Sequence, residues 1–181
     1  MFFYKQISFD FQESITAKLL DIAREFNPNM YMSVAFNKSL LEERIPELVD
    51  QFNNKQLEVD VFREFVSSPL GGLGIHQDGS PGWPKYLALN WPIEHCANTK
   101  MVWWNFLGEP VLSNDAYNYD VAFPSSELKI YKQDRANAVE QCEIITPTLV
   151  NINHYRSVVN GTNYRRMISF RFNPEPWHLI Q

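Results

Sequence analysis

From about residue 57 to residue 173 the sequence is a succession of short segments with strand character, separated by turn residues. Segments such as LEVDV, MVWWNF and RRMISFRF are rich in β-branched and aromatic residues, and LEVDV alternates at period two. Both properties are typical of half-buried strands. Because many short strands follow one another closely, the sequence favours an antiparallel sandwich or barrel over this part of the chain.

The N-terminal part of the chain, up to about residue 55, has helical periodicity instead. Apolar residues recur at helical spacing over residues 15–26, after Asp10 and Glu13, which have the spacing of a capping box. A second helical segment covers residues 39–53, where Pro46 either starts or kinks the helix. The chain is therefore predicted to be α+β and mainly β, with its helices packed outside the β core.

Length, charge and cysteine content restrict the class of protein. A chain of 181 residues is expected to form one domain, residues 1–181. The net charge is −5 and no stretch concentrates Lys and Arg, so strong non-specific binding to nucleic acid or to anionic membranes is not expected. Cys96 and Cys142 have neither zinc-ligand spacing nor disulfide-framework density, which favours free thiols. Without a signal peptide or a long apolar run, we expect a soluble, cytoplasmic protein.

Three residues have the chemistry of a metal site. His76 and Asp78 lie two residues apart in LGIHQDG, and on a strand this spacing puts both side chains on one face. His154, in LVNINHYRSVV, can bring a second imidazole from a distant strand. Two histidines and one carboxylate form the facial triad of non-haem Fe(II) oxygenases, which leaves open positions on the metal. Metal chemistry is therefore the working hypothesis.

The C-terminal segment RRMISFRF adds a second signal. As a strand, it would place alternate residues from Arg165 onward on one face and alternate residues from Arg166 onward on the other. Before it, Asn160 and Gly161 predict a hairpin turn between SVV and YRR. The polar segment 113–138 is expected either to form a loop over a site or to connect strands.

Taken together, these motifs resemble the Fe(II)/2-oxoglutarate-dependent dioxygenases over about residues 60–173. Members of this superfamily share a double-stranded β-helix, a jelly-roll or cupin-like barrel, with HxD on an early strand and a distal His far downstream. A strand of the R-x-x-φ-S-φ-R-F kind closes their core. The resemblance implies that His76, Asp78 and His154 bind Fe(II). It also implies that Arg165 holds the remote carboxylate of 2-oxoglutarate, for which a planar guanidinium is well suited.

The segment YLALN resembles the strand that follows HxD in this family. Tyr86, Ala88 and Asn90 would share one face of it, so Tyr86 and Asn90 are predicted to donate hydrogen bonds to the cosubstrate. The alternative for Tyr86 is simple packing, with its hydroxyl in water.

Two departures from the family pattern leave alternatives open. Many relatives have HSVxN, with the His as ligand, whereas this chain has RSVVN beginning at Arg156. His154 lies two residues earlier with the same face parity and is the predicted ligand. If RSVVN were the true match, Arg156 would occupy the ligand position and iron binding would fail. Similarly, Arg166 is the alternative to Arg165 as the cosubstrate anchor.

The resemblance implies an oxygenase that hydroxylates a C–H bond of a small molecule or an amino-acid side chain and releases succinate and CO₂. Its partners would be 2-oxoglutarate, O₂ and an organic substrate that the sequence does not identify. Because Asp78 is retained, hydroxylation is expected rather than halogenation, and no catalytic residue beyond the metal ligands is predicted. The alternatives are a cupin-type metalloenzyme without 2-oxoglutarate and a metal-free binding module on the same barrel.

Overall fold

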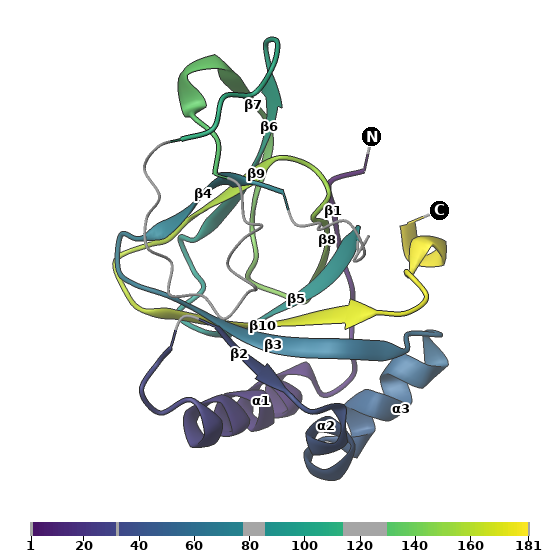
Figure 1. The fold of residues 1–181 in the computed structure, drawn as a ribbon. Helices are drawn as coiled ribbons and strands as arrows, with labels where there is room; N and C mark the ends of the chain where they lie inside the picture. Colours follow the sequence, from purple (N-terminus) through teal and green to yellow (C-terminus); the bar gives the residue numbers. More distant parts are fainter. Residues whose placement is uncertain (1, 32, 78–85, 114–129, 181) are drawn as a thin grey trace.

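A computed structural model describes residues 2–31, 33–77, 86–113 and 130–180 (Figure 1). Within them lie two antiparallel sheets. In order across the sheet, the strands of the six-stranded sheet are β1 (Tyr4–Gln6), β8 (Thr148–Asn151), β5 (Leu87–Glu94), β10 (Arg165–Phe172), β3 (Val59–Ser67) and β2 (Ser33–Phe36). Those of the four-stranded sheet are β4 (Gly72–His76), β9 (Arg156–Val159), β6 (Lys100–Phe106) and β7 (Ala136–Glu143). A mainly β chain, as the sequence predicts, is confirmed.

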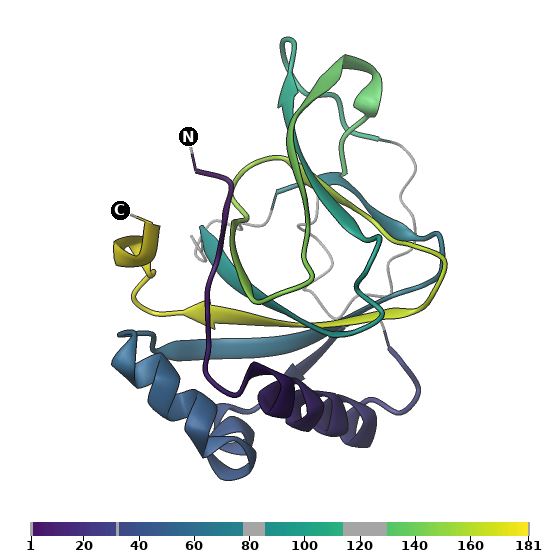
Figure 2. The ribbon, with the colours of Figure 1, turned by 180° about the vertical axis from the view of Figure 1, so that it is seen from behind.

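Three α-helices of the described part cover one face of the six-stranded sheet, and the four-stranded sheet lies over its other face (Figures 1 and 2). They are α1 (Gln12–Phe26), α2 (Lys38–Arg44) and α3 (Pro46–Asn54). Single 3-10 turns, η1 (Gln133–Arg135) and η2 (Trp177–Ile180), precede β7 and end the described chain. The two faces of the six-stranded sheet therefore have different neighbours, helices on one side and strands on the other.

The helix starts differ from their predictions in one respect. The residue before α1 is Phe11, which has a left-handed backbone (φ 53°) and makes no side-chain cap. Asp10 therefore does not form the predicted capping box; its backbone N–H donates to Oε1 of Gln51 on α3 at 2.6 Å. Pro46 is the first residue of α3, where its missing N–H costs nothing, so the prediction that it starts a helix is confirmed.

Among the described residues, two apolar clusters hold the layers together. The larger one fills the space between the helices and the six-stranded sheet, and its largest fully buried side chains are Phe52, Phe62, Trp91, Phe170 and Phe172. The smaller one lies between the two sheets, and its members are Ala88, Cys96, Met101, Trp103, Ile144, Val150, Ile152 and Met167. The second cluster occupies the interior in which the sequence places the candidate site.

Alternate side chains of β10 point to opposite faces of the six-stranded sheet, as the sequence predicts. Ile168 and Phe170 belong to the helix-side cluster, whereas Met167 belongs to the cluster between the sheets. The predicted hairpin is wrong, because β9 lies in the four-stranded sheet and β10 in the six-stranded sheet. Asn160 instead ends β9 with its side-chain amide, which donates to the backbone carbonyls of Ser68 at 2.6 Å and Asn163 at 2.9 Å.

Other expectations are met in part. Cys96 and Cys142 are both free, as predicted. Among the described residues, no helix is long and apolar enough to cross a bilayer. Most of segment 113–138 lies outside the described residues; its C-terminal end forms η1 and the start of β7.

Candidate metal and cosubstrate site

His76 is the last residue of β4, an edge strand of the four-stranded sheet, and only 2% of its surface is exposed. Its Nδ1 is 2.7 Å from the carbonyl oxygen of Gly74. A proton on Nδ1, donated to that carbonyl, fixes the tautomer in which Nε2 carries the lone pair. Proteins orient metal-binding imidazoles in this way, so His76 fits the role of a metal ligand.

His154 is not on a strand, in contrast to the prediction. It lies in the short turn between β8 and β9, half-buried, with its ring 5.5 Å from the ring of Phe3. Burial lowers the pKa of His154 below the ordinary histidine value. The neutral ring, which is the form that binds metals, is favoured there.

The two histidines lie at the same end of the β4–β9 pair. Gln77, which follows His76, donates its side-chain amide to the carbonyl of Asn153, which precedes His154, at 2.8 Å. Asp78 lies outside the described residues, and no group of three metal-binding side chains occurs within them. The described chain thus brings the neighbourhoods of both predicted histidines together, while the complete trio stays a prediction.

Arg156 lies directly opposite His76 in the β4–β9 ladder and is 4% exposed. Its Nη1 donates to the carbonyl oxygen of Ile152 at 2.5 Å. In the alternative match of RSVVN, Arg156 would occupy the ligand position, and the register places it opposite His76. Its bond to the turn that carries His154 has no signal in the sequence, because it depends on the path of that turn.

Arg165 lies on the inner face of β10, toward the four-stranded sheet, and is 4% exposed. Its Nη2 lies 2.8 Å from Sδ of Met167, and the thiol of Cys96 is its other polar neighbour. Nε makes no hydrogen bond, and the described residues provide no carboxylate partner for this guanidinium. A buried cation without a counter-charge is costly. Binding of a carboxylate ligand would offset this cost, so Arg165 fits the remote carboxylate of 2-oxoglutarate.

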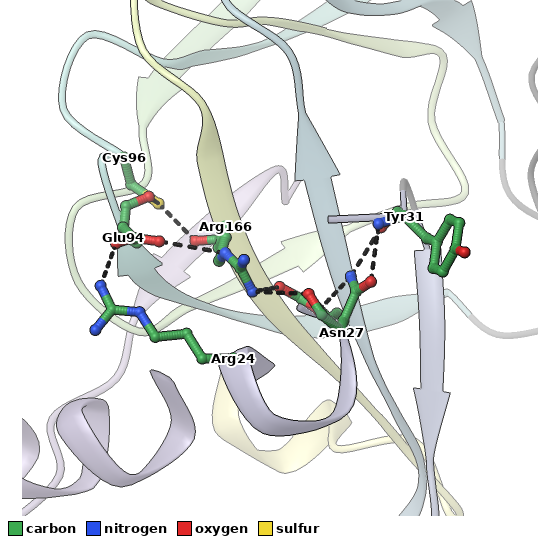
Figure 3. A network of polar contacts seen from close by, with 7 residues as sticks. Arg24, Asn27, Tyr31, Glu94, Cys96 and Arg166 are labelled. Carbon is green, nitrogen blue, oxygen red and sulfur yellow. Dashed lines mark hydrogen bonds and ion pairs between the residues drawn. The ribbon is translucent and has the colours of Figure 1, made fainter. Parts of the chain in front are cut away.

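Arg166 lies on the opposite face, near the C-terminal end of α1, where Arg24 and Asn27 lie (Figure 3). It forms ion pairs with Glu64 at 3.0 Å and with Glu94 at 3.2 Å. Glu64 is fully buried and also accepts from the side chain of Asn27 at 2.7 Å, while Glu94 accepts from Arg24 at 2.6 Å. Burial raises the pKa of Glu64 above the ordinary carboxyl value, despite the hydrogen bonds from Asn27 and Arg166. Arg166 already has two carboxylates, which makes it a structural residue.

Asn90 lies on the inner face of β5, opposite Ser169 of β10. Its Oδ1 accepts a hydrogen bond from Oγ of Ser169 at 2.6 Å, and Oγ of Ser169 accepts from Nη1 of Arg171 at 2.5 Å. On the next strand, half-buried Arg63 is the register partner of Ser169. This polar row was missed except for Asn90; alternation along β3 is the signal that could have found Arg63.

Tyr86 immediately precedes β5 and is 37% exposed. Its ring packs against Trp177 of η2, with centroids 5.9 Å apart, and its backbone N–H donates to Glu175. The structure therefore places the Tyr86 ring against the C-terminal turn, whereas Asn90 lies with the inner face of β10.

Comparisons with known proteins agree in fold and not in sequence. No protein-family model matches the chain, and no curated protein matches it by sequence. A prolyl-4-hydroxylase of Pseudomonas putida has a similar structure, with a TM-score of 0.50 and 8% identity over 93% of this chain and 91% of that one. The viral collagen prolyl hydroxylase of Paramecium Bursaria Chlorella virus-1, solved with 2-oxoglutarate, gives 0.48 and 11% over 94% of each chain. A prolyl 4-hydroxylase from Phytophthora capsici gives 0.49 and 13%, and this chain spans 57% of its length.

The chain thus shares its fold with the prolyl-4-hydroxylase of Pseudomonas putida. At these identities the likeness concerns the fold, and the functional argument rests on the residues of this chain.

Proposed function

We propose that this protein is an Fe(II)- and 2-oxoglutarate-dependent oxygenase that hydroxylates a C–H bond of a small molecule or an amino-acid side chain. The observation that carries the proposal is Arg165, a buried guanidinium between the sheets with sulfur neighbours and no described carboxylate. On this fold, a dicarboxylate cosubstrate is the ligand class that its position and charge fit.

The strand pairing supports a double-stranded β-helix as the scaffold. From β3 onward the pairs are nested: β3 pairs with β10, β4 with β9, β5 with β8, and β6 with β7, all antiparallel. Nested pairing is what results when one long two-stranded ribbon is wound helically into two facing sheets. In such a barrel, the ends of β4 and β9 meet above the interior, where His76 and Arg156 lie opposite each other.

In this proposal His76, Asp78 and His154 hold the metal, and Arg165 holds the far carboxylate of 2-oxoglutarate. Bound Fe(II) would activate O₂ with 2-oxoglutarate as the electron donor, so that one oxygen atom would enter the substrate C–H bond and the other would enter succinate, with release of CO₂. The chain itself binds and orients these groups. The apolar cluster between the sheets, in which Trp103 is fully buried and Met167 nearly so, excludes water from the base of the site.

A specific observation also favours a second candidate, a metal-free module that binds a carboxylate ligand. Arg156 stands directly opposite His76, at the position the RSVVN motif shares with the usual metal ligand. In that case Arg165 would still bind a dicarboxylate, but no metal would be needed.

Calorimetric titration with 2-oxoglutarate, with and without Mn(II), separates the two candidates. For the oxygenase we expect tight binding only when Mn(II) is present, because the metal chelates one end of the cosubstrate and Arg165 the other. Succinate, which lacks the keto oxygen, should bind more weakly. Binding that is equal with and without Mn(II) would favour the metal-free module, and Mn(II) binding without any response to 2-oxoglutarate would favour a cupin-type metalloenzyme.

A further inference from the structure

Asn151, the last residue of β8, and the turn of residues 152–155 that follows it form a five-residue segment whose carbonyl groups accept hydrogen bonds from the rest of the chain. Four of its five carbonyl oxygens accept a hydrogen bond. Trp103 Nε1 donates to Asn151 at 3.0 Å, and Arg156 Nη1 donates to Ile152 at 2.5 Å. Gln77 Nε2 donates to Asn153 at 2.8 Å, and the backbone N–H of Trp104 donates to Tyr155 at 2.8 Å. The remaining residue of this segment is His154. The backbone on both sides of this imidazole is therefore fixed.

Arg156 differs from the other donors in its position. It belongs to β9, where it pairs with His76 of β4 on one side and with Trp103 of β6 on the other. From there its side chain reaches back four residues to the turn. The buried side chain of Arg156 thus links the strand position opposite His76 to the backbone of the turn that carries His154.

We propose that Arg156 is a positioning residue, which holds the turn so that His154 is presented at the end of β4 where His76 lies. The inference rests on the proposed function, since it concerns how the second imidazole reaches the metal. A turn of this length has little regular hydrogen bonding of its own. Fixing its backbone in advance avoids the loss of conformational entropy that would otherwise accompany metal binding.

The charge of Arg156 is compatible with this role because of its orientation. A guanidinium beside a divalent cation would repel it, but Nη1 of Arg156 is directed at the Ile152 carbonyl, whose dipole partly offsets the positive charge.

The test measures Mn(II) affinity by the EPR signal of free Mn(II), together with the visible absorption of the Co(II) form, which reports the number and type of ligands. Arg156→Met should raise the Kd for Mn(II) by about 10- to 100-fold, as loss of a ligand's supporting partner does. Arg156→Lys, which keeps a donor and a charge, should recover part of the affinity. Ser157→Ala is the matched control. Ser157 is the next residue of β9, and its Oγ accepts a hydrogen bond from the indole Nε1 of Trp104, whereas the Trp104 backbone N–H that holds the turn is left in place. The Kd of this variant for Mn(II) should equal that of the wild type.

A double-mutant cycle shows whether Arg156 acts through His154. In a His154→Ala background, Arg156→Met should cause little further loss of Mn(II) affinity or change in the Co(II) spectrum, whereas a general structural effect would add to the first loss. Circular dichroism and urea unfolding confirm that each variant is folded.

Three results would overturn the proposal, and they differ in what they say about function. An unchanged Kd in Arg156→Met, with wild type binding both Mn(II) and 2-oxoglutarate, rejects the positioning role and leaves the oxygenase intact. Tighter Mn(II) binding by Arg156→His, independent of His154, means that Arg156 displaces a ligand. A folded wild type that binds no Mn(II) rejects the positioning role and the oxygenase together.

Discussion

Arg165 and Arg166 are consecutive residues of β10, yet their guanidinium groups lie on opposite faces of the six-stranded sheet and in opposite electrostatic surroundings. Arg166 is paired with two carboxylates near the C-terminal end of α1, whereas Arg165 has a thioether and a thiol as neighbours between the sheets. The two residues are equally buried. Their partners, and not their exposure, therefore separate a structural arginine from a candidate ligand-binding one.

Replacing Arg165 should weaken cosubstrate binding without affecting the metal. Arg165→Met removes the guanidinium and keeps much of the apolar volume, and loss of one partner of a buried charge pair costs about 2–5 kcal/mol. We expect the Kd for 2-oxoglutarate to rise at least about 30-fold, while the Kd for Mn(II) changes little. Calorimetry with each ligand makes the comparison. An unaltered Kd for 2-oxoglutarate would exclude Arg165 as the anchor.

Replacing Arg166 should instead destabilise the fold. Arg166→Met leaves the fully buried Glu64 without its ion pair, and breaking a buried pair in this way costs about 3–5 kcal/mol of unfolding free energy. Arg24→Met is the control, because Arg24 is an exposed partner of Glu94 and such pairs contribute about 0–1 kcal/mol. Urea unfolding measures both. Equal losses in the two variants would contradict the structural role assigned to Arg166.

The raised pKa of Glu64 predicts a pH dependence of stability. When the pKa of an acid is higher in the folded state, the folded protein binds the proton more tightly than the unfolded chain does. The free energy of unfolding of wild type, minus that of Glu64→Gln, should then fall as the pH rises from the ordinary glutamate value of about 4.3 through the raised value. Urea titrations across that pH range provide the measurement. A difference that rises with pH means that ion pairing with Arg166 outweighs desolvation.

The histidines are expected to differ in their contribution to Mn(II) binding. His76→Ala and His154→Ala are each expected to weaken Mn(II) binding strongly while leaving it measurable at high Mn(II) concentration, because two protein ligands hold the metal far less firmly than three. His95→Ala should bind Mn(II) as wild type does, since His95 is an exposed loop residue beyond β5. EPR of free Mn(II) measures all three, with circular dichroism as the check on folding. Full metal affinity in His154→Ala would show that the distal ligand is another residue.

Local patterns predicted those features that depend on residues close together in sequence. Alternation along RRMISFRF gave the correct faces of β10, because a strand has a fixed period of two. The position of Pro46 marked the start of α3, because proline lacks the N–H that the first helical turn does not need. The same alternation correctly put Arg165 and Arg166 on opposite faces.

Features that depend on distant partners were predicted less well. Asn160 and Gly161 signalled a turn, but a local signal does not say which strand comes next in the sheet, and β9 and β10 belong to different sheets. Asp10 was expected to cap α1, whereas its backbone bonds to Gln51, 41 residues away. For the site, the sequence named Arg156 as an alternative, but its bond to Ile152 depends on a turn whose path only the folded chain defines.

The most direct test of the central claim is an anaerobic titration of the Fe(II)-loaded protein with 2-oxoglutarate, followed by visible absorption. Chelation of the metal by the 1-carboxylate and the keto oxygen produces a metal-to-ligand charge-transfer band. We predict a saturable band in the wild type, shifted to higher 2-oxoglutarate concentrations in Arg165→Met and absent in His76→Ala. A folded wild type that gives no band at any concentration of Fe(II) and 2-oxoglutarate would contradict the assignment as a 2-oxoglutarate-dependent oxygenase.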